Sequence, residues 1–335
     1  MKTKNRLSWA IVCTAAIVLC VIIVYDAFFN FVSFSDDFMS MGSVISYKVT
    51  GYEEDARPAH GQLKGDILAL EQEISRNIES SQIEQLNKTG TFTVSDEVLE
   101  YLKESVKISE MSDGAFDVTI GALSALWNFD KDEETVPADE DIRRALSSVG
   151  YEKISFAGNQ VTIPAGMQID LGAVGKGAAC DTAIRVMREN GAKSGAVSAG
   201  GSVGAFGKAI KVGIRNPGGG AGDSVASIRL KDAFVSTSGD YEKFFYKDGK
   251  KYHHLLDTST GYPIENDLSG VTVICKSGFA SDALSTACYA LGLEKSKLLL
   301  DEYDAMAVFI YKDKTIKVYN EAYDFKMLND TYEQK

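Results

Sequence analysis

The sequence predicts an α+β fold, with one folded domain over residues 41–335 after an N-terminal transmembrane segment. Three observations support this prediction. Strand-like and helix-like runs mix along the chain without the regular strand–helix–strand repeat of a parallel α/β sheet. The 335 residues are 45% hydrophobic and 24% charged, which is enough apolar material for a large core. The first 25 residues differ in composition from all that follows.

The N-terminal segment, residues 1–25, has the pattern of a membrane anchor. Three basic side chains within the first six residues precede an uncharged apolar stretch over 7–24, about the minimum length that spans a bilayer. Because the basic residues come first, we expect a single-pass protein of the cell membrane with its folded domain on the extracytoplasmic side. A cleaved signal peptide and a lipoprotein with Cys20 as the lipidated residue are the alternatives. Residues 26–40, rich in Phe, are expected to form a juxtamembrane linker.

The elements of the domain follow from the pattern of apolar residues. Polar and apolar side chains alternate over 41–52, so a strand opens the domain. Helices are predicted over 61–87, 95–111, 174–190 and 281–292. Short strands are predicted near 153–156, 160–163, 194–199, 210–215, 225–230, 251–256 and 270–277, and a hairpin of 305–313 with 315–320 closes the chain.

Charge and cysteine content exclude several kinds of partner and site. A formal charge of −12 argues against a nucleic-acid partner, which normally requires a basic surface. An anionic substrate would therefore need a metal, a lysine or helix N-termini around it. The five cysteines show no CxxC and no metal-type spacing, so we interpret those of the domain as small buried apolar residues.

Two glycine-rich stretches invite comparison with phosphate-binding loops. "DLGAVGKGAACD" (170–181) presents Asp170 and Lys176 beside a predicted helix N-terminus, but only two residues separate Gly172 from Gly175, so it is not a Walker A loop. "SAGGSVGAFG" (198–207) lacks the GxGxxG spacing. A glycine cluster on its own is more often a tight turn than a phosphate site. The first stretch is the stronger candidate because it combines charge with helix N–H groups.

Two further stretches combine residues of possible chemical use. "HHLLDTSTGYP" (253–263) holds two of the three histidines, and His254 precedes Asp257 by three residues. On a strand the two histidines face opposite sides, so one can enter a site; a surface pair beside a turn is the alternative. "SDALSTACYALG" (281–292) places Asp282 and Thr286 four residues apart, on one side of a helix. This pair is either two oxygen ligands of one cation or a helix-start residue with a tolerated polar neighbour.

Seven motifs in this order and spacing resemble the ApbE family, the FAD:protein FMN transferases. They are "MGS", "GAFDVTIGAL", "DLGAVGKGAACD", "SAGGS", "STSGDYEKFF", "HHLLDTSTGYPIEND" and "ASDALSTACYALG". The resemblance implies a T-fold-like catalytic domain that uses Mg²⁺ and takes FAD as its substrate. It implies transfer of FMN to a Ser or Thr hydroxyl of an exported acceptor flavoprotein, with release of AMP.

The resemblance also implies roles for individual residues. The residues expected to contact the flavin nucleotide are Met41, Ala115, Phe116, Asp117, Asp170, Lys176 and Leu256. The expected metal ligands are Asp282, Thr286, the Ala173 carbonyl and Ser285. These oxygen ligands suit Mg²⁺, which would neutralise charge that develops when a pyrophosphate is attacked. The expected catalytic residues are Asp282, His254 as the base for the acceptor hydroxyl, and Asp257, which would orient His254; His254 could equally bind phosphate or the flavin.

Asn77 keeps two other functions open. It falls where many transferases of this family carry an aromatic residue beside the flavin, and its amide oxygen could ligate a second metal. A second metal would favour a metal-dependent FAD pyrophosphatase, in which water replaces the protein hydroxyl. A non-catalytic FAD-binding surface protein is the third alternative. The retention of Asp282 and Thr286 argues against that alternative.

Overall fold

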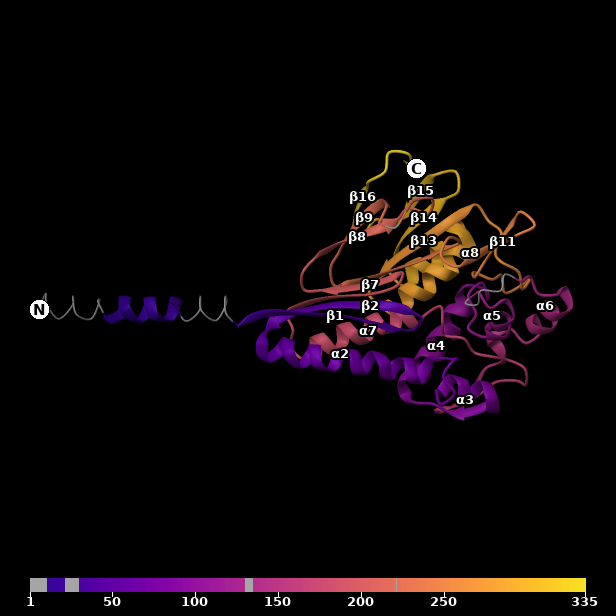
Figure 1. Cartoon of the computed structure of the whole chain (residues 1–335), viewed down its shortest axis with the longest axis horizontal. Coiled ribbons are helices and arrows are strands. Elements are labelled where there is room, and N and C mark those ends of the chain that lie inside the picture. Colours follow the sequence, from indigo (N-terminus) through magenta and orange to yellow (C-terminus); the bar gives the residue numbers. More distant parts are fainter. Residues whose placement is uncertain (1–10, 22–29, 130–134, 221) are drawn as a thin grey trace, which may run out of the picture.

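A nine-stranded sheet forms the centre of the molecule (Figure 1). The computed structural model describes residues 11–21, 30–129, 135–220 and 222–335. In spatial order the strands are β1 (Phe31–Ser40), β2 (Ser43–Tyr52), β6 (Ser194–Ala199), β7 (Ser202–Phe206), β10 (Ala233–Gly239), β13 (Leu268–Cys275), β14 (Met306–Tyr311), β15 (Thr315–Tyr319) and β17 (Glu333–Gln334). All neighbours are antiparallel except β15 with β17. A mainly antiparallel sheet with helices on one face confirms the predicted α+β class.

Three long helices cover one face of this sheet: α2 (Glu53–Ile74), α7 (Gly175–Glu189) and α8 (Gly278–Glu302). In Figure 1, α2 and α7 lie below β1 and β2. The largest core fills the space between sheet and helices, with fully buried side chains from each layer, such as Ile45, Leu63, Ala183 and Leu284. Burial of this apolar surface is the main stabilising term of the fold.

A smaller sheet covers the opposite face of the central one. It consists of β16 (Asp324–Met327), β9 (Ser224–Leu230) and β8 (Ile210–Arg215). Its apolar side chains, among them Val225 and Ile228, pack against Met306 and Val308 of β14 in a second core. The C-terminal half of the molecule therefore has three layers, with the central sheet buried on both faces.

A third, small core lies at one end of the molecule. It joins α5 (Gly121–Trp127) and α6 (Asp139–Leu146) to a separate hairpin of β11 (Phe244–Lys247) and β12 (Lys250–His253). Trp127 lies at its centre, and its indole N–H donates a hydrogen bond to the Gly261 carbonyl at 2.8 Å. The remaining elements are α3 (Gln82–Thr89), β3 (Thr91–Thr93), α4 (Asp96–Met111), a 3₁₀ turn (Tyr151–Lys153), β4 (Ser155–Ala157) and β5 (Gln160–Thr162).

Most predicted elements are confirmed within a residue or two. The helices over 95–111 and 174–190 correspond to α4 and α7, and the closing hairpin corresponds to β14 and β15. The helix predicted over 281–292 lies inside α8, which begins at Gly278 and continues past a break at Gly292, where φ is 73°.

The first strand differs from the prediction. Residues 31–40, expected in a linker, form β1, which pairs with β2 along ten residues from Phe31 opposite Tyr52 to Ser40 opposite Ser43. The prediction was wrong there because the apolar residues do not keep to one face of the strand: Phe31 and Met39 are exposed, and Asp36 lies on the inward side. Phe38 is nevertheless buried, and Phe34 stacks on His60 of α2 with ring centroids 5.1 Å apart. The folded domain therefore includes residues from Phe31 onward and does not start at Met41.

The helix predicted over 61–87 is two helices. α2 begins earlier, at Glu53, and ends at Ile74, and α3 begins after Ser81. The Ser81 hydroxyl accepts a hydrogen bond from the Glu84 N–H at 3.0 Å and donates one to the Ser75 carbonyl at 2.6 Å. This is an N-cap with Glu at the third helical position, a start signal that outweighs the continued spacing of apolar residues.

The predicted membrane anchor lies largely outside the described residues. Of residues 1–25, only 11–21 are described, and they are helical. In the described parts of the chain, no helix is both long enough and apolar enough to cross a membrane.

Candidate active site

Helices α7 and α8 meet at two glycines. A Cβ atom on Gly177 would lie 2.1 Å from the Gly278 carbonyl oxygen, and one on Gly278 would lie 2.3 Å from the Gly177 oxygen. Only glycine permits this approach of the two backbones. It brings Asp282 of α8 to the first turn of α7, where the Gly177 N–H donates a hydrogen bond to Asp282 Oδ2 at 2.9 Å. The carboxylate therefore occupies a helix N-terminus, where free N–H groups and the helix dipole favour negative charge.

Asp181, one turn further along α7, fixes the start of α8. Its carboxylate accepts hydrogen bonds from the N–H groups of Gly278 and Phe279, at 2.8 and 2.7 Å, and from the Ser277 hydroxyl at 3.2 Å. These N–H groups have no partner within the helix, so Asp181 caps α8 from a neighbouring helix. The two contacts of α7, through Gly177 and Asp181, hold the backbone of Asp282 in place.

The Asp282 carboxylate is buried and close to one lysine. It is 4% exposed. Burial raises its pKa, whereas Lys176, the Gly177 N–H and the Ser202 hydroxyl act in the opposite direction. A buried carboxylate with so few partners carries a desolvation cost that a cation would offset.

A group of hydroxyls connects α8 to the central sheet. Ser238 of β10 lies 2.8 Å from the Ser285 hydroxyl and 3.0 Å from that of Thr286. Ser285 is fully buried and also donates to the Asp282 carbonyl at 2.8 Å, whereas Thr286 is half-buried. Of the two predicted hydroxyl ligands, Thr286 is therefore the more accessible.

The Ala173 carbonyl lies one helical turn before Gly177 and accepts no backbone hydrogen bond from the described residues. The predicted ligands Asp282, Thr286 and this carbonyl are a carboxylate and two neutral oxygens, the kind of oxygen donors that Mg²⁺ prefers. The described residues contain no group of three or more His, Cys, Asp or Glu side chains that could hold a metal ion, either at this site or elsewhere. A metal at Asp282 would complete its shell with substrate and water oxygens.

The surroundings of His254 favour its neutral form. Its pKa is lowered to about 4, mainly by burial and also by the positive charges of Lys176 and Lys243. Its Nδ1 atom is buried and has no hydrogen-bond partner within the described residues. A neutral imidazole with a free ring nitrogen is able to accept a proton at neutral pH. His253 is different, because it packs edge-on against Tyr289 of α8 and contacts the Ile264 carbonyl at 3.0 Å.

Asp257 has other partners than the predicted one. Its Oδ1 accepts hydrogen bonds from Ser259 N–H and hydroxyl, at 2.7 and 2.6 Å, and from Thr260 N–H at 3.3 Å. No hydrogen bond from Asp257 to His254 occurs in the part of the chain that is described. Asp257 therefore holds the turn after His254 and does not orient the imidazole directly. The Thr258 hydroxyl ties this turn to the Gly114 carbonyl at 2.6 Å.

Comparison with known proteins identifies the family. The sequence profile described as "ApbE family" matches residues 41–310. The chain belongs to the ApbE family. A protein of Treponema pallidum named FAD:protein FMN transferase is 32% identical over 78% of this chain and 81% of its own length. A protein of the same name from Klebsiella pneumoniae is 30% identical over 82% and 88%.

Solved ApbE structures have the same fold. The ApbE protein of Thermotoga maritima superposes with a TM-score of 0.78 at 32% identity, covering 85% of this chain and 96% of that one. The flavinyl transferase ApbE of Pseudomonas stutzeri gives a TM-score of 0.73 at 30% identity, covering 85% and 92%. The resemblance found in the sequence is thereby confirmed, and the fold is an ApbE-like α+β fold.

The two acidic residues of the ApbE motifs on the flavin side are held within the protein. Asp117 accepts hydrogen bonds from the Thr119 N–H and hydroxyl, at 2.8 and 2.7 Å, and from the Tyr151 N–H at 2.9 Å. Asp170 pairs with Arg76, whose Nη1 lies 2.9 Å from Oδ2, and accepts the Gly172 N–H at 2.8 Å. Both carboxylates therefore shape loops around the first turn of α7, and direct contact with a ligand stays a prediction.

The apolar ApbE positions divide into buried and accessible ones. Phe116 and Leu256 are buried in the cores. Ala115 and Met41 are half-buried. The Met41 N–H donates to Glu71 Oε1 at 2.7 Å, and its sulfur lies 3.6 Å from the position of a Cβ atom on Gly175. Met41 is thus fixed against the start of α7.

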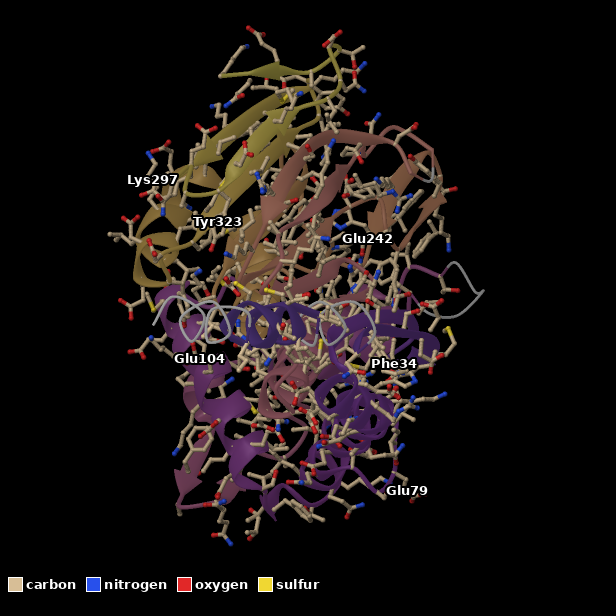
Figure 2. All side chains as sticks on the ribbon, turned by 90° about the vertical axis from the view of Figure 1, so that its left-hand side faces the viewer. Phe34, Glu79, Glu104, Glu242, Lys297 and Tyr323 are labelled. Carbon is tan, nitrogen blue, oxygen red and sulfur yellow. The ribbon has the colours of Figure 1, made fainter. Side chains whose placement is uncertain are left out.

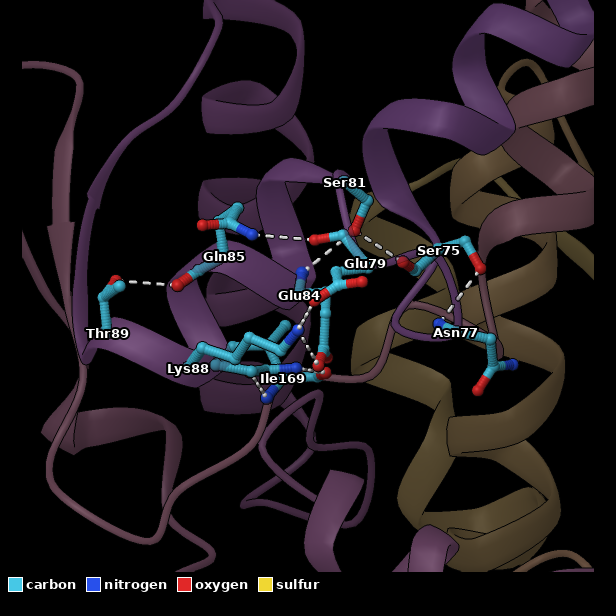
Figure 3. Close-up of polar contacts among 10 residues, drawn as sticks. Ser75, Asn77, Glu79, Ser81, Glu84, Gln85, Lys88, Thr89 and Ile169 are labelled. Atoms are coloured by element: carbon cyan, nitrogen blue, oxygen red, sulfur yellow. Dashed lines mark hydrogen bonds and ion pairs between the residues drawn. The ribbon is translucent and has the colours of Figure 1, made fainter.

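Asn77 is exposed in the turn between α2 and α3. Its backbone N–H donates to the Ser75 hydroxyl at 3.2 Å. Figure 3 shows its amide group pointing away from the contacts of Ser81 and Glu84. Its neighbour Arg76 bonds to Asp170 and to the Gly121 carbonyl at 2.8 Å. Asn77 therefore lies next to the predicted flavin side, while no described contact joins it to Asp282.

Sequence reasoning missed four charged residues around the site: Glu71, Arg76, Asp181 and Glu242. Glu242 (Figure 2) follows β10. Desolvation by the surrounding protein raises the pKa of Glu242, whereas the positive charges of Lys176 and Arg215 lower it. Glu242 and Asp181 lie within the ApbE-like motifs STSGDYEKFF and DLGAVGKGAACD, and this position in a motif is the one sequence feature that points to them. Their partners lie far away along the chain, such as Gly278 for Asp181, so spacing alone does not reveal the contacts.

Proposed function

We propose that this chain is a Mg²⁺-dependent FAD:protein FMN transferase. It attaches FMN from FAD to a Ser or Thr hydroxyl of an acceptor flavoprotein and releases AMP. The observation that carries the proposal is the buried Asp282 carboxylate at the first turn of α7, where the charge of Lys176 acts on both Asp282 and His254. The names of the Treponema and Klebsiella relatives support the activity.

The residues suit attack on a pyrophosphate. The acceptor oxygen forms a bond to the phosphorus of the FMN half, the bond from that phosphorus to the bridging oxygen breaks, and AMP leaves with that oxygen. The Lys176 ammonium group binds phosphate oxygens as a positive charge. Asp282, Thr286 and the Ala173 carbonyl would hold Mg²⁺, which when bound neutralises charge on the phosphate and on the leaving group. The Ser285 hydroxyl is hydrogen-bonded to Ser238 of β10, so Ser285 could ligate the metal only if that hydrogen bond breaks.

His254 is the proposed acceptor of the hydroxyl proton. Its lowered pKa keeps it neutral at pH 7, and its Nδ1 is unpaired in the described structure. General base catalysis by such a group contributes about 10²- to 10⁴-fold to a rate. Asp257 supports this role at a distance, by fixing the turn that follows His254.

The flavin side of the site is formed by the loops that Asp117 and Asp170 organise. Met41 and Ala115 are the half-buried side chains proposed to contact FAD. Phe116 and Leu256 support the pocket from the cores behind it.

One assay separates the proposed activity from its two alternatives. Residues 31–335 are incubated with FAD, Mg²⁺ and an exported FMN-domain protein that carries a Ser/Thr attachment site, and the products are run on a denaturing gel. A fluorescent acceptor band supports the transferase. FMN found only free in solution indicates a pyrophosphatase, the activity that Asn77 would favour, and intact FAD after prolonged incubation indicates a binding protein.

We also propose the location of the enzyme. The basic–apolar pattern of residues 1–25 supports a single-pass anchor in the cell membrane with the domain and its acceptor on the extracytoplasmic side. Protease added to intact cells should cut the domain. Protection of the domain, while a known surface protein is cut, would contradict this location.

A further inference from the structure

The β11–β12 hairpin has one buried face and one exposed face. On the buried face, Phe245 is 7% exposed and stacks on Tyr252 with ring centroids 5.4 Å apart. On the opposite face, Phe244 is 44% and Tyr246 is 60% exposed, although both are large aromatic side chains. Among described residues, the hairpin forms a sheet of its own, so its strand edges have no further strand beside them. An unpaired edge is a surface to which an extended segment can add.

The exposed aromatic side chains form a compact group with a lysine. The rings of Phe244 and Tyr246 meet edge-on with centroids 5.8 Å apart. Lys251, opposite Tyr246 in the register, places its Nζ 4.6 Å from the centroid of the Phe244 ring. We call these three side chains the aromatic–lysine face. Aromatic rings with an adjacent cation are typical of binding surfaces for protein segments.

The hairpin is also basic within an acidic protein. Residues 243–253 contain four lysines and one aspartate, a formal charge of +3, whereas the whole chain carries −12. Lys250 and Lys251 have acidic partners at the base of the hairpin, Glu265 at 2.6 Å and Asp240 at 3.1 Å. Lys247 is exposed near the tip. Lys247 has no ion pair within the described residues, so its charge favours an acidic side chain on the partner.

The base of the hairpin leads into the active site. The His254 N–H donates a hydrogen bond to the Lys243 carbonyl at 3.0 Å. His253, opposite Phe244 in the register, packs on Tyr289 of α8, the helix that carries Asp282. A segment bound along the hairpin would therefore lie beside the end of β12, where His253 and then His254 follow.

We propose that the aromatic–lysine face, with Lys247, is the docking surface for the acceptor protein. The bound part is an extended segment with acidic and apolar side chains near the Ser or Thr that receives FMN. Its apolar side chain packs on Phe244 and Tyr246, and its carboxylate faces Lys247. This inference rests on the proposed transferase function.

The test compares steady-state FMN transfer by full-length variants to the FMN-domain acceptor of the assay above. Phe244→Ser/Tyr246→Ser should raise the KM for the acceptor about tenfold, as expected for loss of two aromatic contacts. The kcat and the FAD affinity, measured by flavin fluorescence, should change less than about twofold. Lys247→Glu should raise the same KM several-fold at low salt, with a smaller difference at high salt.

Matched controls lie on the far part of α8. Leu298 is 83% exposed and Lys295 is also exposed, so Leu298→Ser/Lys295→Glu removes an exposed apolar and an exposed basic group away from the hairpin. This variant should have the wild-type KM. If Phe244→Ser/Tyr246→Ser lowers the melting temperature, Tyr246→Ser alone replaces it in the test, because Tyr246 is the more exposed of the two rings.

The outcomes separate the two proposals. An unchanged acceptor KM in the hairpin variants overturns the docking surface while leaving the transferase intact. A parallel loss of FAD affinity also overturns it, because the hairpin would then belong to the FAD site. If the wild type transfers no FMN, the proposed function fails and the docking surface fails with it.

Discussion

At the scale of single residues, the site depends on one buried charge. Asp282→Asn keeps an oxygen that can accept the Gly177 N–H but removes the negative charge that would hold Mg²⁺. We expect turnover to fall at least about 100-fold, as for loss of a major electrostatic contact in a transition state. Without Mg²⁺ the variant should melt at or above the wild-type temperature, because a buried carboxylate costs desolvation energy.

The measurements for Asp282→Asn are AMP release and thermal unfolding with and without Mg²⁺. Mg²⁺ should raise the melting temperature of the wild type but not of the variant. Glu294→Gln, the same change at an exposed position of α8, serves as the control. Equal stabilisation of both proteins by Mg²⁺ would remove Asp282 from the metal site.

His254 gives a prediction about pH. Its pKa is 6.5 in its ordinary state and about 4 in the fold. Between these values the unfolded chain binds more protons than the folded one, so the free energy of unfolding falls as pH falls through 6.5 and levels off below about 4. His254→Asn should show a flatter dependence between pH 4.5 and 7, as measured by urea unfolding. Identical slopes in both proteins would show that His254 is not desolvated.

The candidate site could be predicted from the sequence where both interacting residues lie on the same helix or strand. Asp282 and Thr286 lie one turn apart on a helix, so their spacing alone places two oxygens together. Asp181 caps a helix that begins 97 residues later along the chain, and no local pattern encodes that contact. Asp257 shows the converse. Its spacing from His254 suggested a pair, but the turn residues that follow it compete successfully for its carboxylate.

At the scale of elements, the packing of α7 on α8 sets the geometry. Gly177→Ala would place a Cβ atom 2.1 Å from the Gly278 oxygen and 2.8 Å from Asp282 Cβ. The helices must separate, at a cost of about 1–3 kcal/mol in the free energy of unfolding. Transfer activity should fall as well, because Asp282 moves away from the first turn of α7. Urea unfolding and AMP release measure the two effects.

Gly61→Ala is the matched control for Gly177→Ala. Gly61 lies inside α2, and a Cβ atom there would meet nothing within 4 Å. Alanine should stabilise the protein by about 0.5–1 kcal/mol through helix propensity, with activity unchanged. If Gly177→Ala has the same stability and activity as Gly61→Ala, the close approach of α7 and α8 is not required for stability or activity.

The predicted elements fail where local patterns conflict with tertiary contacts. Apolar spacing continues through Ile74 and Ile78, which suggested one helix over 61–87. The Ser81 cap starts a new helix instead. β1 was missed for a related reason. At the edge of the sheet five of its ten residues are exposed, among them Phe31 and Met39, so the pattern of apolar residues does not match the pattern of burial.

At the scale of the whole molecule, β1 links the N-terminal segment to the catalytic domain. It is the edge strand of the central sheet, and its Phe34 (Figure 2) stacks on His60 of α2. The Ser40 hydroxyl donates to Glu71 Oε2 at 2.6 Å, on the same carboxylate that holds Met41. The chain that leads from the predicted anchor is therefore continuous with the flavin side of the site.

This connection predicts how truncation affects the enzyme. A chain that begins at residue 31 keeps the full β1–β2 ladder, whereas one that begins at residue 41 loses ten strand residues and the buried ring of Phe38. The shorter chain should melt at a lower temperature and associate in solution, because β2 becomes an exposed edge. It should also bind FAD more weakly, since Met41 then follows a free N-terminus. Thermal unfolding, size-exclusion chromatography and flavin fluorescence test these effects, and equal stability of the two chains would show that β1 adds nothing to the domain.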